Sequence, residues 1–294
     1  MNISKMIKLI SINLIALCYL FISTGCEPDP KMIGYGSNEY SQLEFPGTNW
    51  NHEPLVQGYQ NVWAGGNFSI AYNNGGYYNY YYDMYYSDYT GLHCKGDSSL
   101  GQCDLPDELG GIIESNYGNY GPQPINLPNQ QNMSLGYNHG IAKIRDSITL
   151  AGNFGSILLL WGDNSFNQTT MPDLPDTVRI DKITAGNNHN LILAGDPILE
   201  ETDSTSFYVT QNLRLIAWGD NTYGQCDVPE KFNPIADSLT IIQIEAGANH
   251  NVVLYDSSGV TKMSAWGDNT YGQSEIISSD LLTGNNSVLK LDCG

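Results

Sequence analysis

The chain has 294 residues, of which 31 are acidic and 12 are basic, so its formal net charge at pH 7 is −19. A surface this acidic excludes nucleic acid as a partner, because phosphate binding needs a concentrated positive face. The apolar content of 41% is ordinary for a globular protein and is enough to bury a core.

The N-terminus has the pattern of an export signal. MNISKMIK is a short basic region, and LISINLIALCYLFI is an apolar run too short to span a bilayer comfortably. Ser-Thr-Gly before Cys26 resembles the lipobox of bacterial lipoproteins, although Ser23 stands where that family usually has an aliphatic residue. The resemblance implies that residues 1–25 are removed, that Cys26 carries the lipid and that residues 26–31 form a short tether. Plain secretion with cleavage nearby is the alternative.

A first motif recurs along the rest of the chain. Its copies are YGSNEYSQLEFP from Tyr35, KGDSSLGQCDLP from Lys95, WGDNSFNQTTMP from Trp161, WGDNTYGQCDVP from Trp218 and WGDNTYGQSEII from Trp266. The three copies that begin with Trp continue with Gly162, Gly219 and Gly267. A glutamine falls seven places after each leading residue: Gln42, Gln102, Gln168, Gln225 and Gln273. A catalytic site is built once, whereas a unit that stacks on its own copies is written many times.

A second motif alternates strictly with the first. Its copies are WAGGNFSIAY from position 63, LGYNHGIAKI from 135, AGNNHNLILA from 185, AGANHNVVLY from 246 and a fainter TGNNSVLKL from 283. The runs HNLILA, LRLIAWG, HNVVLY and TKMSAWG favour short β-strands, and the GDN segments favour turns. No stretch beyond the signal has a helical period, so the sequence predicts an all-β fold made of repeated strand–turn units, a β-propeller.

The two ends of the mature chain predict closure of this propeller. It begins with a first-motif strand, KMIGYG, and ends with a second-motif strand, SVLKLDC. Pairing of these N- and C-terminal strands would remove an exposed sheet edge.

The two motifs together resemble the repeat of the regulator of chromosome condensation family. The similar pattern is W-G-x-N-x-x-G-Q-x-x-x-P followed by A-G-x-x-H, and it extends over nearly all of residues 32–291. The resemblance implies a propeller domain over residues 32–294 with four-stranded blades. The best-known propellers of the family have seven blades, whereas this chain shows five clear units and a degenerate sixth candidate, YGNYGPQPINLP, from Tyr117. Five, six and seven blades therefore stay open.

One segment breaks the repeat. AYNNGGYYNYYYDMYYSDYTGLH at 71–93 holds nine of the twenty tyrosines, and NNGG is a turn signal, so we expect an extended hairpin or loop. Tyrosine offers a large rigid contact area with a polar tip and stacks on sugar rings, which makes this segment a candidate binding surface. Low-complexity drift on a surface loop is the alternative. The candidate residues are Tyr77, Tyr78, Tyr80, Tyr81, Tyr82, Tyr85, Tyr86 and Tyr89. A second variable stretch at 195–212 is interpreted as an acidic loop and is a weaker candidate.

Residues repeated in register are expected to serve the unit rather than one active site. His139, His189 and His250 share one position and are expected to be partly buried and bonded to backbone. The repeated aspartates are interpreted as turn residues rather than calcium ligands, since one carboxylate per blade hardly converges on one ion. The leading tryptophans are expected to pack blade on blade, and the glutamines to bond loop backbone. We predict no metal and no cofactor.

Four cysteines remain outside the signal and the lipobox. In an exported protein Cys94 and Cys103 are the nearest possible pair, but free buried thiols are the expectation for Cys226 and an alternative for Cys103.

No catalytic motif is present, so the predicted function is binding and not catalysis. We expect a lipid-anchored scaffold in the bacterial cell envelope, at the outer membrane or cell surface, that binds an envelope protein or a glycan. The family resemblance implies protein binding through one face of the propeller, as in a nuclear exchange factor and in an inhibitor of β-lactamase. An envelope enzyme acting on polysaccharide, which needs no sequence signature, and a purely structural surface component are the alternatives.

Overall fold

A computed structural model describes residues 39–40, 59–73, 77–79, 84–86, 91–109, 132–148, 154–175, 178–201, 206–276 and 293. Within these residues the fold is all-β, with one short 3₁₀ turn, η1 (Asp107–Leu109). The strands form four three-stranded antiparallel sheets and one two-stranded sheet. None of the described elements is a helix long and apolar enough to cross a membrane. The export signal, Cys26 and the tether lie outside these residues.

Three of the four three-stranded sheets are built from consecutive strands, whereas the first skips β3 and β4. In each of the four, the strand that is second along the chain lies in the centre. The first sheet contains β1 (Tyr59–Ala64), β2 (Phe68–Asn73) and β5 (Gly91–Gly96). The second contains β6 (Met133–Leu135), β7 (His139–Ile148) and β8 (Phe154–Gly162). The third contains β9 (Arg179–Ala185), β10 (His189–Glu201) and β11 (Ser206–Gly219). The fourth contains β12 (Leu239–Ala246), β13 (His250–Ser257) and β14 (Val260–Gly267).

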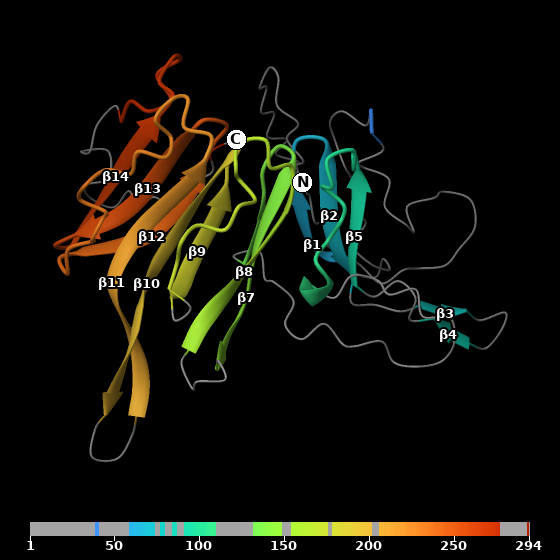
Figure 1. The fold of residues 1–294 in the computed structure, drawn as a ribbon, viewed down its shortest axis with the longest axis horizontal. Coiled ribbons are helices and arrows are strands. Elements are labelled where there is room, and N and C mark those ends of the chain that lie inside the picture. Colours follow the sequence, from blue (N-terminus) through green and yellow to red (C-terminus); the bar gives the residue numbers. More distant parts are fainter. Residues whose placement is uncertain are drawn as a thin grey trace, which may run out of the picture.

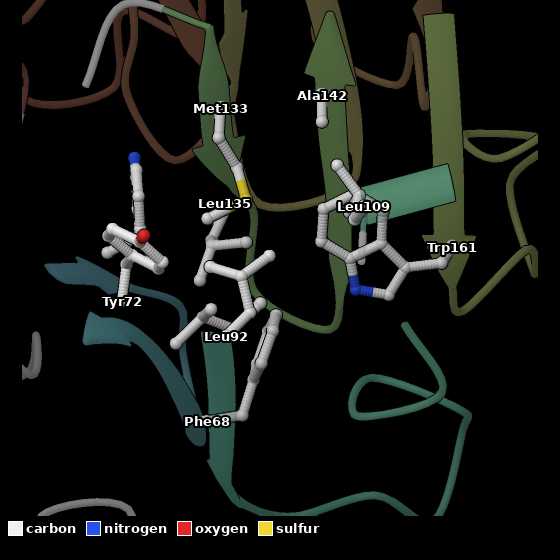
Figure 2. Close-up of a cluster of buried hydrophobic side chains, with 10 residues drawn as sticks. Phe68, Tyr72, Leu92, Leu109, Met133, Leu135, Ala142 and Trp161 are labelled. Atoms are coloured by element: carbon white, nitrogen blue, oxygen red, sulfur yellow. The ribbon is translucent and has the colours of Figure 1, made fainter. Parts of the chain in front are cut away.

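The four sheets stand side by side in chain order, and the core lies between them (Figure 1). Between the first two sheets, Phe68 and Leu92 face Met133 and Leu135 (Figure 2). The other two layers lie between the second and third sheets and between the third and fourth. Every interior layer is thus shared by two neighbouring sheets, which is how a unit that cannot form a core alone becomes stable.

The middle strands explain why the second motif is apolar at successive positions. In β10, Leu191 and Leu193 pack into the layer toward the fourth sheet, whereas Ile192 and Ala194 pack into the layer toward the second. Successive side chains of a strand point to opposite faces, so a strand buried on both faces is apolar throughout.

Residues 195–201 and 206–212 form a β-ribbon and not a loop, so that interpretation was wrong for them. β10 and β11 continue their pairing from Asp196↔Gln211 to Glu201↔Ser206. The acidic residues suggested a loop, but the segment also contains Ile198 and the run FYV, which favour strands.

The sheets have three strands, where the family resemblance implied four. Beside β11, the short segment Phe232–Ile235 takes the fourth place: Leu215 N–H donates to Phe232 O (2.9 Å), and Ile235 N–H donates to Leu213 O (2.7 Å). Pro234 lies inside this segment, and proline has no N–H to continue a ladder. The segment Phe232–Ile235 therefore makes two hydrogen bonds with β11 but does not form a strand.

The predicted closure of the propeller involves residues 32–38 and 277–292, which lie outside the described residues. The same holds for the degenerate copy from Tyr117 and for the fifth copy of the second motif. Closure and blade number therefore stay predictions.

Candidate functional site

The first motif forms the same loop at the end of each sheet's last strand. These glutamine loops comprise residues 97–106, 163–172, 220–229 and 268–276. Each is entered through a glycine with positive φ, at 91° for Gly162 and 111° for Gly219, for example. A Cβ on Gly162 would also lie 2.4 Å from the Asn138 carbonyl oxygen. Only glycine fits this backbone conformation at such a close approach, which accounts for the Gly that follows every leading residue.

The repeated aspartates hold the start of each loop. Asp163 Oδ1 accepts hydrogen bonds from the Ser165 N–H (3.0 Å) and the Ser165 hydroxyl (2.6 Å). The aspartates of the other three loops accept the N–H two residues onward in the same way. The bond from the Ser99 N–H holds the pKa of Asp97 below its usual value. These carboxylates are bonded one to a loop, as turn residues are.

The glutamines tie each loop to the next sheet. The side-chain oxygen of Gln168 accepts the Phe166 N–H at 2.8 Å, and the three other loops repeat this bond. The Gln168 backbone oxygen accepts two bonds from the third sheet, from Trp218 Nε1 (3.1 Å) and Asn190 Nδ2 (2.7 Å). The Gln225 backbone oxygen accepts the equivalent pair from the fourth sheet. The tryptophans therefore contribute a hydrogen bond as well as packing.

The histidines continue this connection between sheets. His139 Nε2 lies 3.0 Å from Asn190 Oδ1, and His189 Nε2 lies 3.0 Å from Asn251 Oδ1. Because Asn190 donates its Nδ2 to a carbonyl, its Oδ1 must face the imidazole, and His139 Nε2 must carry the proton. Burial lowers the pKa of His139 to about 4 and also lowers the pKa values of His189 and His250. The bonding partner is thus a side chain of the neighbouring sheet and not the expected backbone.

Two of the cysteines, Cys103 and Cys226, lie in the glutamine loops. In the second to fourth loops an asparagine oxygen accepts the N–H five residues later, as Asn221 Oδ1 does from Cys226 at 2.8 Å. The first loop has Ser98 at that place, and here a disulfide joins Cys94 to Cys103. The free-thiol alternative for Cys103 was therefore wrong. Cys226 is a free thiol, and burial raises its pKa to about 12.

One position of the first motif is exposed to solvent. The residue five places after the leader is large and apolar in every copy and is 41–91% exposed: Tyr40, Leu100, Phe166, Tyr223 and Tyr271. The sequence analysis missed these tip residues, although their fixed offset was a visible signal. The loop around them has its turns fixed by hydrogen bonds, so they are presented on rigid supports.

The four glutamine loops follow β5, β8, β11 and β14, and these strands end at one edge of the molecule, which we call the loop face (Figure 1). It also carries the second-motif turns, because the Asp97, Asp163, Asp220 and Asp268 N–H groups each donate to a carbonyl of such a turn. The turns are joined across sheets, for Tyr137 N–H donates to Asn187 O and Asn187 N–H to Ala248 O. With Tyr137 and Met171, this face holds seven of the twelve exposed large apolar side chains of the described residues.

The tyrosine segment lies at the opposite edge, where the hairpins between middle and last strands end (Figure 1). A hairpin was expected there, and β3 (Tyr77–Asn79) pairs antiparallel with β4 (Met84–Tyr86). The backbone register pairs Tyr77 with Tyr86 and Tyr78 with Tyr85. Tyr80, Tyr81, Tyr82 and Tyr89 lie outside the described residues.

Comparisons with known proteins give structural matches only. No protein-family model and no curated protein matches the chain. Among solved structures it is similar to yeast RCC1 (Prp20) bound to Kap60, with 18% identity, a TM-score of 0.40 and coverage of 74% of this chain and 45% of that one. It is also similar to the ectodomain of the receptor kinase CR4 of Physcomitrella patens, with 16% identity, a TM-score of 0.36 and coverage of 73% and 42%. Human WBSCR16 matches with 14% identity, a TM-score of 0.31 and coverage of 73% and 63%. The chain spans less than half the length of the first two.

Proposed function

We propose that the chain is an exported, lipid-anchored β-propeller that binds a protein of the bacterial cell envelope through its loop face. The row of tip residues carries this proposal. Five motif copies place a large apolar side chain at the same exposed position, and an exposed apolar patch of this kind marks interaction surfaces in soluble proteins.

The most exposed tip residue contributes too little to folding to explain its presence. Tyr271 is 91% exposed, so its ring adds almost nothing to the core. Its loop, in contrast, is fixed by bonds from Asp268, Asn269 and Gln273. A rigid loop loses little entropy when its tip is buried by a partner, which makes such tips effective anchors.

The tips also favour a protein over a small ligand. Successive tips belong to successive sheets, so a partner must extend over several sheets to cover more than one of them (Figure 1). Aromatic anchors surrounded by polar atoms are the usual composition of a protein interface. The tyrosine ribbon β3–β4 is a second candidate surface, for a protein or a glycan, because its register pairs tyrosine with tyrosine at two positions.

Described carboxylates give no support to the polysaccharide-enzyme alternative. A general acid of that class needs a raised pKa. Hydrogen bonds from the Thr270 side chain and backbone instead hold the pKa of Asp268 low, and Asp97 is shifted in the same direction.

Site-specific photo-crosslinking in living cells tests the proposed surface. A photoreactive residue replaces Tyr223 on the loop face, Tyr78 on the tyrosine ribbon or, as a matched control, Val260 at the 41% exposed hairpin end of the fourth sheet. We expect one crosslinked envelope protein from position 223 and none from 260. Crosslinks from position 78 alone would move the binding surface to the ribbon, and crosslinks to glycan or to nothing at 223 would overturn the proposal.

A further inference from the structure

The glutamine loops are acidic and contain no compensating base. Their described residues include seven carboxylates and no Lys, Arg or His: Asp97, Asp104, Asp163, Asp220, Asp227, Asp268 and Glu275. The nearest base after the third loop, Lys231, is already engaged, since its ammonium bonds the Tyr255 hydroxyl (3.1 Å) and lies over the Phe232 ring.

These charges flank the tip residues in a fixed order. The motif places an acid three residues before the tip, and in three of the four loops a second acid follows four residues after it, as Asp220 and Asp227 do around Tyr223. Asp104, Asp227 and Glu275 are exposed. Asp97 and Asp268 keep their charge, because turn bonds hold the pKa values of these two carboxyl groups low. Each tip is therefore an apolar centre with a negative rim.

Basic residues pair with some of the acids outside the loops. On the long ribbon Arg214 Nη1 lies 3.1 Å from Asp196 Oδ1, and on β9 Arg179 Nε lies 3.3 Å from Asp181 Oδ1. The carboxylates of the glutamine loops have no base within the described loop residues, and they coincide with the exposed apolar row.

We infer that the partner of the loop face is a basic protein surface, one that places Lys or Arg side chains against the loop carboxylates and apolar side chains against the tips. This rests on the proposed function and adds the chemistry of the partner to it. Complementary charge raises the association rate and excludes acidic competitors, while the apolar anchors supply the affinity. A partner lacking cations would leave several carboxylates desolvated and unpaired at the rim.

The test uses the mature protein and defined peptides, with binding measured by fluorescence anisotropy at low and at moderate salt. The probes are soluble peptides that repeat Gly-Lys-Trp-Lys, Gly-Lys-Ser-Lys or Gly-Glu-Trp-Glu. One variant removes three exposed loop charges (Asp104→Asn, Asp227→Asn and Glu275→Gln) and leaves the turn aspartates intact. The matched control removes three exposed charges outside the loops: Asp107→Asn, Glu108→Gln and Asp237→Asn.

We expect the Lys–Trp peptide to bind best, with affinity that falls as salt rises. The loop variant should bind it about tenfold more weakly, at less than 1 kcal/mol for each exposed charge, and the control should bind it nearly as well as the natural protein. Equal losses in both variants, or equal binding of the Glu–Trp peptide, would overturn the inference. In either case crosslinking at position 223 still decides the proposed function separately.

Discussion

His139 connects two neighbouring sheets and is neutral in the folded protein. Its Nε2 proton is committed to Asn190 of the third sheet. Burial of the ring away from water is the main cause that lowers its pKa to about 4, and the hydrogen bond with Asn190 opposes this shift.

This connection predicts a loss of stability in mild acid. An unfolded histidine takes up a proton near pH 6.5, whereas folded His139 does so only near pH 4, so the unfolded state binds more protons between these values. The contribution of His139 to the free energy of unfolding should be fully present above pH 6.5. It should fall by about 2 kcal/mol between pH 7 and pH 5. His189 and His250 add to the fall in the same direction. Urea unfolding at the two pH values measures it.

His139→Gln is the control for the pH effect, because a glutamine amide still donates a hydrogen bond and does not titrate. Its stability should fall less than that of the natural protein between pH 7 and pH 5. Identical falls in both proteins would show that His139 is not the group responsible.

At the level of the loop, the repeat predicts a second disulfide that the chain lacks. Cys226 occupies the place of Cys103, and Ala217 occupies the place of Cys94, directly before the leading residue. Ala217→Cys should therefore form a disulfide with Cys226 across the same loop geometry. We expect about 1–3 kcal/mol of added stability under oxidising conditions, removed by reductant. Free-thiol titration and denaturant unfolding with and without reductant measure both effects.

Ala265→Cys in the fourth loop is the matched control, because its counterpart there is Ser274. That variant should gain no reductant-sensitive stability. A free Cys226 in the oxidised Ala217→Cys protein would show that the third loop does not share the geometry of the first.

Much of each unit was predictable from the motifs, because a residue repeated in register reports a repeated structural need. The strand starts at His189 and His250 and the strand ends at Gly219 and Gly267 coincide with the predicted runs. The features that could not be predicted lie outside the motifs or depend on contacts between units. The β10–β11 ribbon has no copy elsewhere to align with, and the partners of His139 and His189 are asparagines 51 and 62 residues away. The tip residues were missed because a large apolar residue at an exposed position of a loop resembles the chance variation that loops usually show.

At the level of the whole molecule, the proposed function requires that the loop face be held at the cell surface. The lipidation prediction for Cys26 supplies the anchor. Cys26→Ala should abolish incorporation of labelled fatty acid and move the protein from the membrane fraction to the soluble fraction. Removal of Lys5 and Lys8 with the signal takes the net charge from −19 to −21, and so acidic a mature chain has little affinity of its own for an anionic bilayer. Metabolic labelling and cell fractionation measure the two outcomes. Labelling that persists in the variant would place the lipid elsewhere.

The contacts are the same at the boundary of the second and third sheets and at that of the third and fourth: a glutamine carbonyl on one side, and a tryptophan and an asparagine donor on the other. Units joined in this way are interchangeable. The identical stretches at 217–225 and 265–273 are also a natural place for unequal recombination of the gene. An exchange there would add or remove one whole unit and keep every boundary bond, so the length of the loop face can change in a single genetic step, and related strains should differ by whole units and not by fractions of one.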